Sequence, residues 1–206
     1  MLEWLPAGSA HGPAVITLLS WGAAEVALRV RLAVRPGLRA RLSTWSAAAG
    51  GRLREWTFFV VVLAIAAAVI CALWLDRLGQ FAIGGGDLTI VAGEVLAVAG
   101  IALRLWAILT LDKFFTFVVG IAADHRVVQH GPYRLLRHPG YAGALLALLG
   151  VGIALGNWLS LLLMVAVPVL ALGIRITVEE ARMTDALGAE YLCYAERTPR
   201  LIPGLW

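Results

Sequence analysis

Long apolar runs separated by polar connections dominate the chain. The run Trp56–Leu75 contains twenty residues without one charge, which is enough for a helix to cross a bilayer. Further apolar runs cover residues 13–28, 88–111, 141–155 and 158–174. Because only helices and closed barrels satisfy their backbone hydrogen bonds in lipid, we expect an all-α integral membrane protein with about five transmembrane helices.

The last two apolar runs are separated only by Gly156-Asn157, a dipeptide typical of turns. We therefore expect these runs to form a C-terminal helical hairpin. The second helix of the hairpin is expected to continue to about Leu187, with Gly188 as its C-cap. A shorter amphipathic helix should follow and end near Pro199.

Basic residues fall almost entirely in alternate connections. Seven arginines lie in 29–54, four cations lie in 113–137 and four arginines follow the last run, whereas the connection 76–87 holds only Arg77. Positively charged connections tend to stay in the cytoplasm. We therefore expect the chain to sit in the cell (inner) membrane with its N-terminus outside and its C-terminus in the cytoplasm, an arrangement that requires an odd number of spans.

The composition agrees with a lipid environment. Of the 206 residues, 61% are hydrophobic and 15% are charged, against about 25% charged residues in soluble domains. The opening MLEWLPAGSAHGP has no basic segment, so no cleavable signal peptide is expected. The two cysteines, Cys71 and Cys193, make neither a disulfide framework nor a metal site. The net charge of +4 is better explained by membrane topology than by nucleic-acid binding.

Three ionisable residues fall inside apolar runs. Glu25 and Glu94 are functional candidates because a charge in lipid is costly, but the sequence assigns a role to neither. Arg104 lies seven residues from the cytoplasmic end of its run, so we expect its side chain to reach toward the interface. Ten residues separate Glu94 from Arg104, which places them on different helix faces and argues against a simple pair.

Two polar clusters are expected on the cytoplasmic side. In the first, 124–141, Pro139 keeps His138 out of the helical region and starts a helix whose free N–H groups suit an anionic moiety. In the second, 175–203, Arg175 and Glu179 share a helix face. Carboxylates and tyrosine rings suit a small zwitterionic cofactor. The same residues are explained equally well without a cofactor. The arginines can be positively charged anchors on the cytoplasmic side, the tyrosines an aromatic belt, and the carboxylates part of a solvated helix face. The histidines lack zinc-ligand spacing, so no metal is expected.

The combined motifs of these clusters are specific. The segment HGPYRLLRHPGYAG, the hairpin, R-x-x-x-EE, G-x-EY-x-x-Y and TPRLIP resemble the isoprenylcysteine carboxyl methyltransferase family between about Asp124 and Pro203. The resemblance implies an integral membrane enzyme that uses S-adenosylmethionine in a cytoplasmic cofactor pocket. It divides the chain into residues 1–112, with three N-terminal transmembrane helices and an Arg-rich loop, and residues 113–206, the methyltransferase catalytic region.

The same resemblance implies roles for individual residues. It matches the cofactor contacts to His125, Arg126, Val127, Val128, Tyr133, His138, Pro139, Gly140, Tyr141 and Glu179. It matches Arg175 to an arginine that orients the acceptor. A carboxylate acceptor is already ionised at neutral pH and needs no general base, whereas a phenol or an amine would need one, and Glu180 or His138 is then the candidate.

The implied reaction is O-methylation of a carboxylate, or of another head-group oxygen, on a lipophilic or prenylated acceptor. Phospholipid N-methylation, phenolic-lipid O-methylation and an NADPH-dependent sterol-type reductase stay open as alternatives, and so does the oligomeric state. The Arg-rich connection 29–55 has no assigned role, although anionic lipid headgroups suit it. The arginine- and alanine-rich composition is typical of a GC-rich bacterium, where prenylated proteins are not expected as substrates.

Overall fold

The computed structural model describes residues 11–33, 52–76, 81–111 and 127–203, and every regular element within them is a helix. The elements are α1 (His11–Ala33), α3 (Arg52–Asp76), α4 (Asp87–Leu111), the 3-10 turn η2 (Gly131–Arg134), α5 (Pro139–Ala154), α6 (Trp158–Leu187) and α7 (Ala189–Arg197). The prediction of an all-α chain is confirmed.

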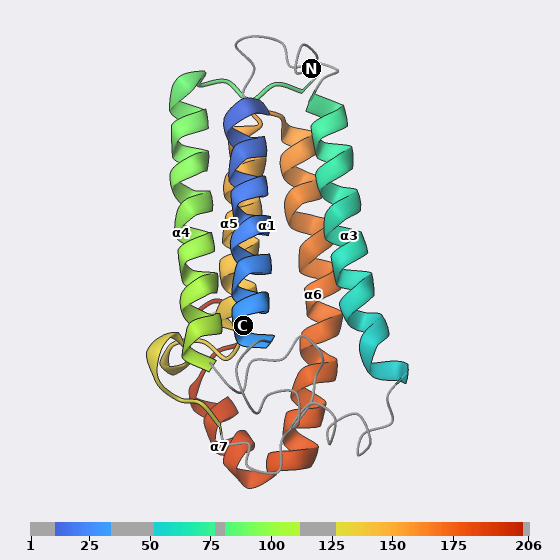
Figure 1. Cartoon of the computed structure of the whole chain (residues 1–206), viewed down its shortest axis with the longest axis vertical. Coiled ribbons are helices and arrows are strands. Elements are labelled where there is room, and N and C mark those ends of the chain that lie inside the picture. The colour runs from blue at the N-terminus through green and yellow to red at the C-terminus, as the bar shows by residue number, and fades with distance from the viewer. Residues whose placement is uncertain (1–10, 34–51, 77–80, 112–126, 204–206) are drawn as a thin grey trace.

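The five long helices run side by side as a bundle, and α7 lies at one end of it (Figure 1). Helix α4 packs on α5 and α3 packs on α6, while contacts between α5 and α6 join the two pairs. Helix α1 packs on α4 and α5. The end of the bundle that carries η2 and α7 is called the polar end below, because both polar clusters of the sequence meet there.

The surface of the bundle is rich in hydrophobic side chains. Helices α4 and α6 are long and apolar enough to cross a membrane, and shorter apolar helical stretches cover Gly12–Leu28, Phe59–Leu75 and Pro139–Ala154. Large side chains such as Leu63 and Leu170 remain exposed. Apolar surface of this extent is typical of helices that face lipid. The five-span topology and its orientation stay predictions.

Helices α4 and α5 approach so closely that no side chain fits between their backbones. A Cβ atom added at Gly100 would lie 2.3 Å from the backbone nitrogen of Ala147, and one added at Gly150 would come equally close to α4. Gly93 and Gly143 lie seven residues before these two glycines, on the same helix faces, and are packed almost as tightly. Small residues that let two backbones approach closely are characteristic of helix pairs in membranes.

The predicted hairpin turn at Gly156-Asn157 is confirmed. Gly156 has a φ of 68°, a left-handed conformation that glycine adopts without strain. The Asn157 side chain caps α6 by accepting hydrogen bonds from the N–H groups of Leu159, at 2.9 Å, and Ser160, at 3.1 Å. The segment before α4 binds the same turn, because the Ile83 N–H donates to the Gly156 carbonyl at 2.6 Å.

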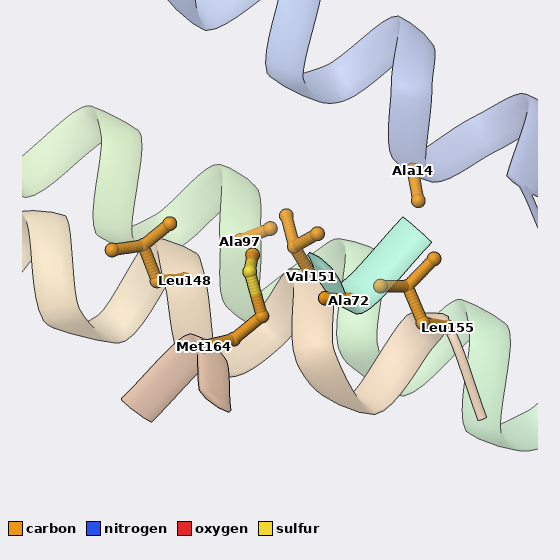
Figure 2. Packing of buried hydrophobic residues seen from close by; sticks show 7 residues of the cluster. All are labelled: Ala14, Ala72, Ala97, Leu148, Val151, Leu155 and Met164. Atoms are coloured by element: carbon orange, nitrogen blue, oxygen red, sulfur yellow. The ribbon is translucent and has the colours of Figure 1, made fainter. Parts of the chain in front are cut away.

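Small and medium-sized apolar side chains fill the interior toward this turn (Figure 2). Every long helix contributes to the cluster, which consists of Ala14, Ala72, Ala97, Leu148, Val151, Leu155 and Met164. Alanines supply the contacts from α1, α3 and α4, so these helices come close to the larger side chains of α5 and α6. The apolar cluster closes the bundle at the turn and leaves the polar end to other residues.

Helix α6 extends well past the apolar run that predicted it. It continues to Leu187, and Gly188, with a φ of 53°, separates it from α7. The C-cap and the short amphipathic helix expected after the hairpin are therefore confirmed. The extension carries Arg175 and Glu179 to the polar end of the bundle.

Candidate active site

A cavity of about 520 Å³ lies inside the bundle and reaches the polar end. Its apolar walls come from all five long helices. Its polar lining consists of Glu25, Arg104, Tyr133, Arg137, His138, Tyr141, Arg175, Glu179, Tyr191 and Tyr194. This volume falls within the range of roughly 300–1,000 Å³ that is common for small-molecule sites. The cavity is therefore the candidate active site.

Tyr141 links an arginine to a carboxylate on the wall of the cavity. The Arg175 Nε donates to the Tyr141 hydroxyl at 2.7 Å, and that hydroxyl donates to Glu179 Oε2 at 2.7 Å. Arg175 and Glu179 lie one turn apart on α6, so both face the cavity as their spacing predicts. The second oxygen of Glu179, Oε1, accepts no hydrogen bond within the described part of the chain. This oxygen can accept one from a ligand.

Glu180, the next residue, is turned away from the cavity and ties three segments together. It is only 8% exposed. Its carboxylate lies 2.9 Å from Arg137 Nη1, 3.1 Å from His138 Nε2 and 2.8 Å from Arg200 Nε. The geometry describes a tie between α6, the loop before α5 and the segment after α7. The role of Glu180 as a base for a phenol or an amine stays a prediction.

Backbone hydrogen bonds reinforce this tie. The Arg137 N–H donates to the Pro199 carbonyl at 2.8 Å, and the His138 N–H donates to the Arg200 carbonyl at 3.0 Å. The His138 ring stacks on the Tyr141 ring, with their centroids 5.6 Å apart. The start of α5 is thus fixed by residues 198–201 (TPRL) as well as by Pro139.

Two tyrosines of α7 close the polar end. The Tyr194 hydroxyl donates to the Tyr133 carbonyl at 2.7 Å and to the Leu136 carbonyl at 3.3 Å, which holds η2 against α7. Burial raises the pKa of Tyr194 above its usual value. Burial, and next the charge of Glu180, raise the pKa of Tyr191 to about 12. Both phenols therefore stay protonated at neutral pH and keep their donor O–H groups.

Most of the cofactor contacts implied by the family resemblance come together here. Seven of the ten line the cavity: Val127, Val128, Tyr133, His138, Gly140, Tyr141 and Glu179. Pro139 is buried as the first residue of α5, so it shapes the wall and does not line it. His125 and Arg126 lie outside the described residues. The Val127 N–H donates to Glu190 Oε1 at 3.1 Å, which joins the upstream loop to α7.

The structure corrects the expectation for Arg104. Its charge is paired within the bundle, because its Nε and Nη2 both donate to the carboxylate of Glu25 on α1, with 3.1 Å between Nη2 and Oε2. Arg104 Nη1 donates to the Gly140 carbonyl at 3.1 Å, and Trp21 Nε1 donates to Glu25 Oε1 at 2.8 Å. A nearby opposite charge stabilises the guanidinium inside the bundle, so snorkelling is unnecessary.

Glu94 makes a separate contact with α1. Its Oε2 accepts a hydrogen bond from the Thr17 hydroxyl, while its buried Oε1 has no partner within the described residues. The expectation that Glu94 and Arg104 do not pair with each other agrees with this arrangement. The sequence singled out Glu25, Glu94 and Arg104. It did not predict that α4 contacts α1 at two places, through Arg104 at Glu25 and through Glu94 at Thr17.

Comparisons with known proteins identify relatives for about half of the chain. Residues 93–185 match the model of the isoprenylcysteine carboxyl methyltransferase (ICMT) family. A probable protein-S-isoprenylcysteine O-methyltransferase of Oryza sativa subsp. indica is 34% identical over 113 residues, which are 54% of this chain and 59% of that protein. The protein-S-isoprenylcysteine O-methyltransferase of Schizosaccharomyces pombe is 35% identical over 103 residues, 49% of this chain and 44% of that protein.

The described residues form a helical protein with an apolar surface and an internal cavity that has a polar end. Over residues 93–185 the chain is similar to the isoprenylcysteine carboxyl methyltransferase family, the same family that its motifs resemble. The matched region spans less than two thirds of the length of these relatives. The relatives come from plants, yeasts and an insect. These organisms contradict the bacterial source that the composition predicted. The prediction failed because an arginine- and alanine-rich composition is not specific to one lineage.

Proposed function

We propose that this chain is an S-adenosylmethionine-dependent O-methyltransferase that methylates the carboxylate of a lipophilic acceptor. The observation that carries the proposal is one cavity with two chemically different ends. One end presents Tyr141, Arg175 and Glu179, and the other end is lined by apolar side chains such as Leu148 and Val69. A ligand with a charged head and a hydrocarbon chain complements both ends. The names of the relatives support the same reaction and an isoprenylated thioether as acceptor.

The residues of the polar end fit S-adenosylmethionine by their chemistry. Glu179 Oε1 is available to accept hydrogen bonds from ribose hydroxyls. The rings of Tyr133 and Tyr141 line the same space and suit an adenine or a positively charged sulfonium. Family resemblance assigns these three positions to the cofactor. When bound, the cofactor supplies an electrophilic methyl group on a positively charged sulfur.

The residues of the chain align the acceptor for the reaction and exclude water from it. An acceptor carboxylate is ionised at neutral pH, so its oxygen attacks without a general base. Arg175 orients the acceptor head, and the Tyr141 hydroxyl fixes the Arg175 guanidinium against Glu179. Apolar walls from α3, α5 and α6 exclude water from the reacting oxygen. Tyr133, Tyr141 and Glu179 would hold the methyl donor, which would supply its methyl group to the carboxylate oxygen and keep the carbon–sulfur bond electrons on sulfur.

The polar end of the bundle is proposed to face the cytoplasm. The segments 127–137 and 188–203, which flank the cavity there, belong to the basic side of the charge pattern. Five spans with the N-terminus outside place the C-terminal segment, η2 and α7 in that compartment. Cofactor then arrives from the cytoplasm and the acceptor arrives from the membrane.

The proposal is tested by thermal stability of the detergent-purified protein with S-adenosylhomocysteine or, separately, with NADPH. A ligand present at about 100 times its Kd stabilises the folded state by roughly 2.7 kcal/mol, which is a measurable rise in Tm. We expect a rise with S-adenosylhomocysteine, no rise with NADPH, and loss of the effect in Glu179→Ala. The exposed Glu196→Ala on α7 is the matched control and should keep the full response.

Methyl transfer to S-farnesylated N-acetylcysteine, followed with a labelled methyl donor, completes the test. Base-labile methyl ester formation by the wild type, reduced at least tenfold in Glu179→Ala, is the expected result. Stabilisation by NADPH alone would refute the methyltransferase and favour the reductase. Stabilisation by S-adenosylhomocysteine with methylation only of an amine or a phenol would refute the carboxylate as acceptor.

A further inference from the structure

The cavity has one side that is not closed by packing. Helix α1 packs on α4 and α5, whereas α3 packs on α6, so α1 and α3 belong to different sides of the cavity. On these two helices several lining residues remain exposed. Val26 of α1 is 58% exposed and Val62 of α3 is 44% exposed, and both border the cavity. Residues that line a cavity and also face outward mark its opening, so the cavity opens sideways between α1 and α3.

The polarity along α1 changes from the polar end toward the interior. Glu25 stands at the level of Arg104, and Leu18 lies two turns earlier and packs against the buried apolar cluster. Seven residues of helix separate them, which corresponds to about 10 Å. The opening therefore leads from an ion pair into an apolar slot that the cluster around Leu148 closes. Such a slot suits a hydrocarbon chain whose head stays at the polar end.

Gly22 is an exposed residue of α1 that lines this slot. It lies three residues before Glu25 and four after Leu18, so it shares their helix face and lines the cavity. A Cβ atom added there meets nothing within 4 Å. A larger side chain at this position would fill open space in the slot without clashing with its own bundle. A glycine in the middle of a helix costs about 1 kcal/mol relative to alanine, and no close packing requires one at position 22.

We propose that α1 selects the hydrocarbon chain of the acceptor and that Gly22 sets the width of chain that can enter between α1 and α3. This inference rests on the proposed function. It goes beyond it, because α1 lies outside the residues that match the family. The ion pair of Glu25 with Arg104 holds the selecting helix in place on the site.

The test compares Gly22→Leu with wild type on carboxylate acceptors that share one head group and differ in chain. The chains are a short unbranched alkyl group and a branched farnesyl group on N-acetylcysteine. We expect Gly22→Leu to lower kcat/KM for the farnesyl acceptor at least tenfold and for the short acceptor less than threefold. The exposed neighbour Ala23, which does not line the cavity, provides the control Ala23→Leu and should change neither value. Equal loss for both acceptors, or no loss, overturns the inference.

A second measurement does not depend on methyl transfer. Trp21 lines the cavity beside Gly22, so a chain in the slot that carries bromine atoms should quench its fluorescence. We expect saturable quenching by a brominated alkyl carboxylate in wild type, lost in Trp21→Phe and weakened at least tenfold in Gly22→Leu. Quenching without methylation of any acceptor would refute the proposed function and keep the chain site. Methylation of the farnesyl acceptor without quenching at Trp21 would refute the chain site alone.

Discussion

The helix pair α4–α5 and the helix α1 are attached to the same bundle by opposite means. Between α4 and α5, glycines let the two backbones touch over three turns. Helix α1 instead depends on two polar contacts, Glu25 with Arg104 near the polar end and Thr17 with Glu94 nearer the hairpin turn. Ala14 of α1 belongs to the buried apolar cluster, and Leu18 and Trp21 pack against it. The α4–α5 attachment is close backbone packing, whereas the attachment of α1 combines side-chain packing with two polar ties.

The difference separates the rigid part of the site from the adjustable part. Close backbone packing has no alternative arrangement of similar energy, so it fixes Gly140 and the start of α5 against α4. In lipid, hydrophobic burial does not favour one apolar helix neighbour over another, and polar contacts then decide where a helix docks. The family match covers residues 93–185, which includes the packed pair and excludes α1. Under the proposed function, the cofactor side of the cavity therefore depends on close packing and the acceptor side on the attachment of α1.

The largest expected effect comes from breaking the ion pair of α1. Glu25→Gln leaves the Arg104 charge without its carboxylate, and removal of one partner from a buried pair costs roughly 3–5 kcal/mol. The reporter is Ala14→Cys in a chain whose exposed cysteines, Cys71 and Cys193, are replaced by serine. Ala14 is fully buried, so a thiol there reacts with maleimide only when α1 leaves the bundle. We expect labelling to become at least 100-fold faster in Glu25→Gln.

Replacing both partners sharpens this result. Two well-packed apolar residues in place of an ion pair are often as stable as the pair itself. Glu25→Leu combined with Arg104→Leu should therefore restore most of the protection of the thiol at position 14. Unchanged labelling in Glu25→Gln would mean that packing, and not the ion pair, holds α1.

An intermediate effect is expected from separating the packed pair. Gly100→Ala adds a Cβ atom 2.3 Å from the backbone of α5, so the two helices must move apart. Overpacking of this kind costs roughly 1–3 kcal/mol, measured as a lower Tm in detergent. Gly173 of α6 is the matched control, because a Cβ atom there meets nothing within 4 Å. Gly173→Ala should leave the Tm unchanged or raise it, and an equal drop in both variants would contradict the close packing.

The smallest effect is expected from the second polar tie. Thr17→Val keeps the shape of the side chain and removes its hydrogen bond to Glu94. A single hydrogen bond contributes about 1 kcal/mol, so thiol labelling at position 14 should become several-fold faster. In the control Thr177→Val, the lost hydroxyl binds only the carbonyl of Ile174 in its own helix, and labelling should not change. A larger effect than that of Glu25→Gln would reverse the order of the two ties.

Much of the fold could be predicted because its signals are local. The apolar runs, the Gly156-Asn157 turn and the Gly188 cap each depend on residues that are adjacent in sequence. The close packing of α4 on α5 also left a signal, since glycines recur seven residues apart at 93 and 100 and again at 143 and 150. The conformation around His138-Pro139 followed from the steric restriction that proline imposes.

The contacts between distant segments could not be predicted in the same way. Glu25 and Arg104 are 79 residues apart, and their pairing depends on how α1 is rotated against α4. No sequence pattern reports that rotation in an almost uniformly apolar helix. The partners of Glu180 are likewise set by the tertiary fold, since one of them is Arg200 beyond α7. Sequence reasoning placed Glu179 and Glu180 together, and only the structure separates the one in the cavity from the one in the tie.

The hydrogen bonds of the segment TPRL have a consequence for how the protein assembles during synthesis. Pro199 and Arg200 are among the last described residues to leave the ribosome, yet they bind the backbone of Arg137 and His138 and the carboxylate of Glu180. The five long helices can be inserted before these bonds exist. The half-made protein can therefore occupy the membrane with the polar end of its cavity unfinished, and under the proposed function it would bind the methyl donor only after translation has passed residue 200.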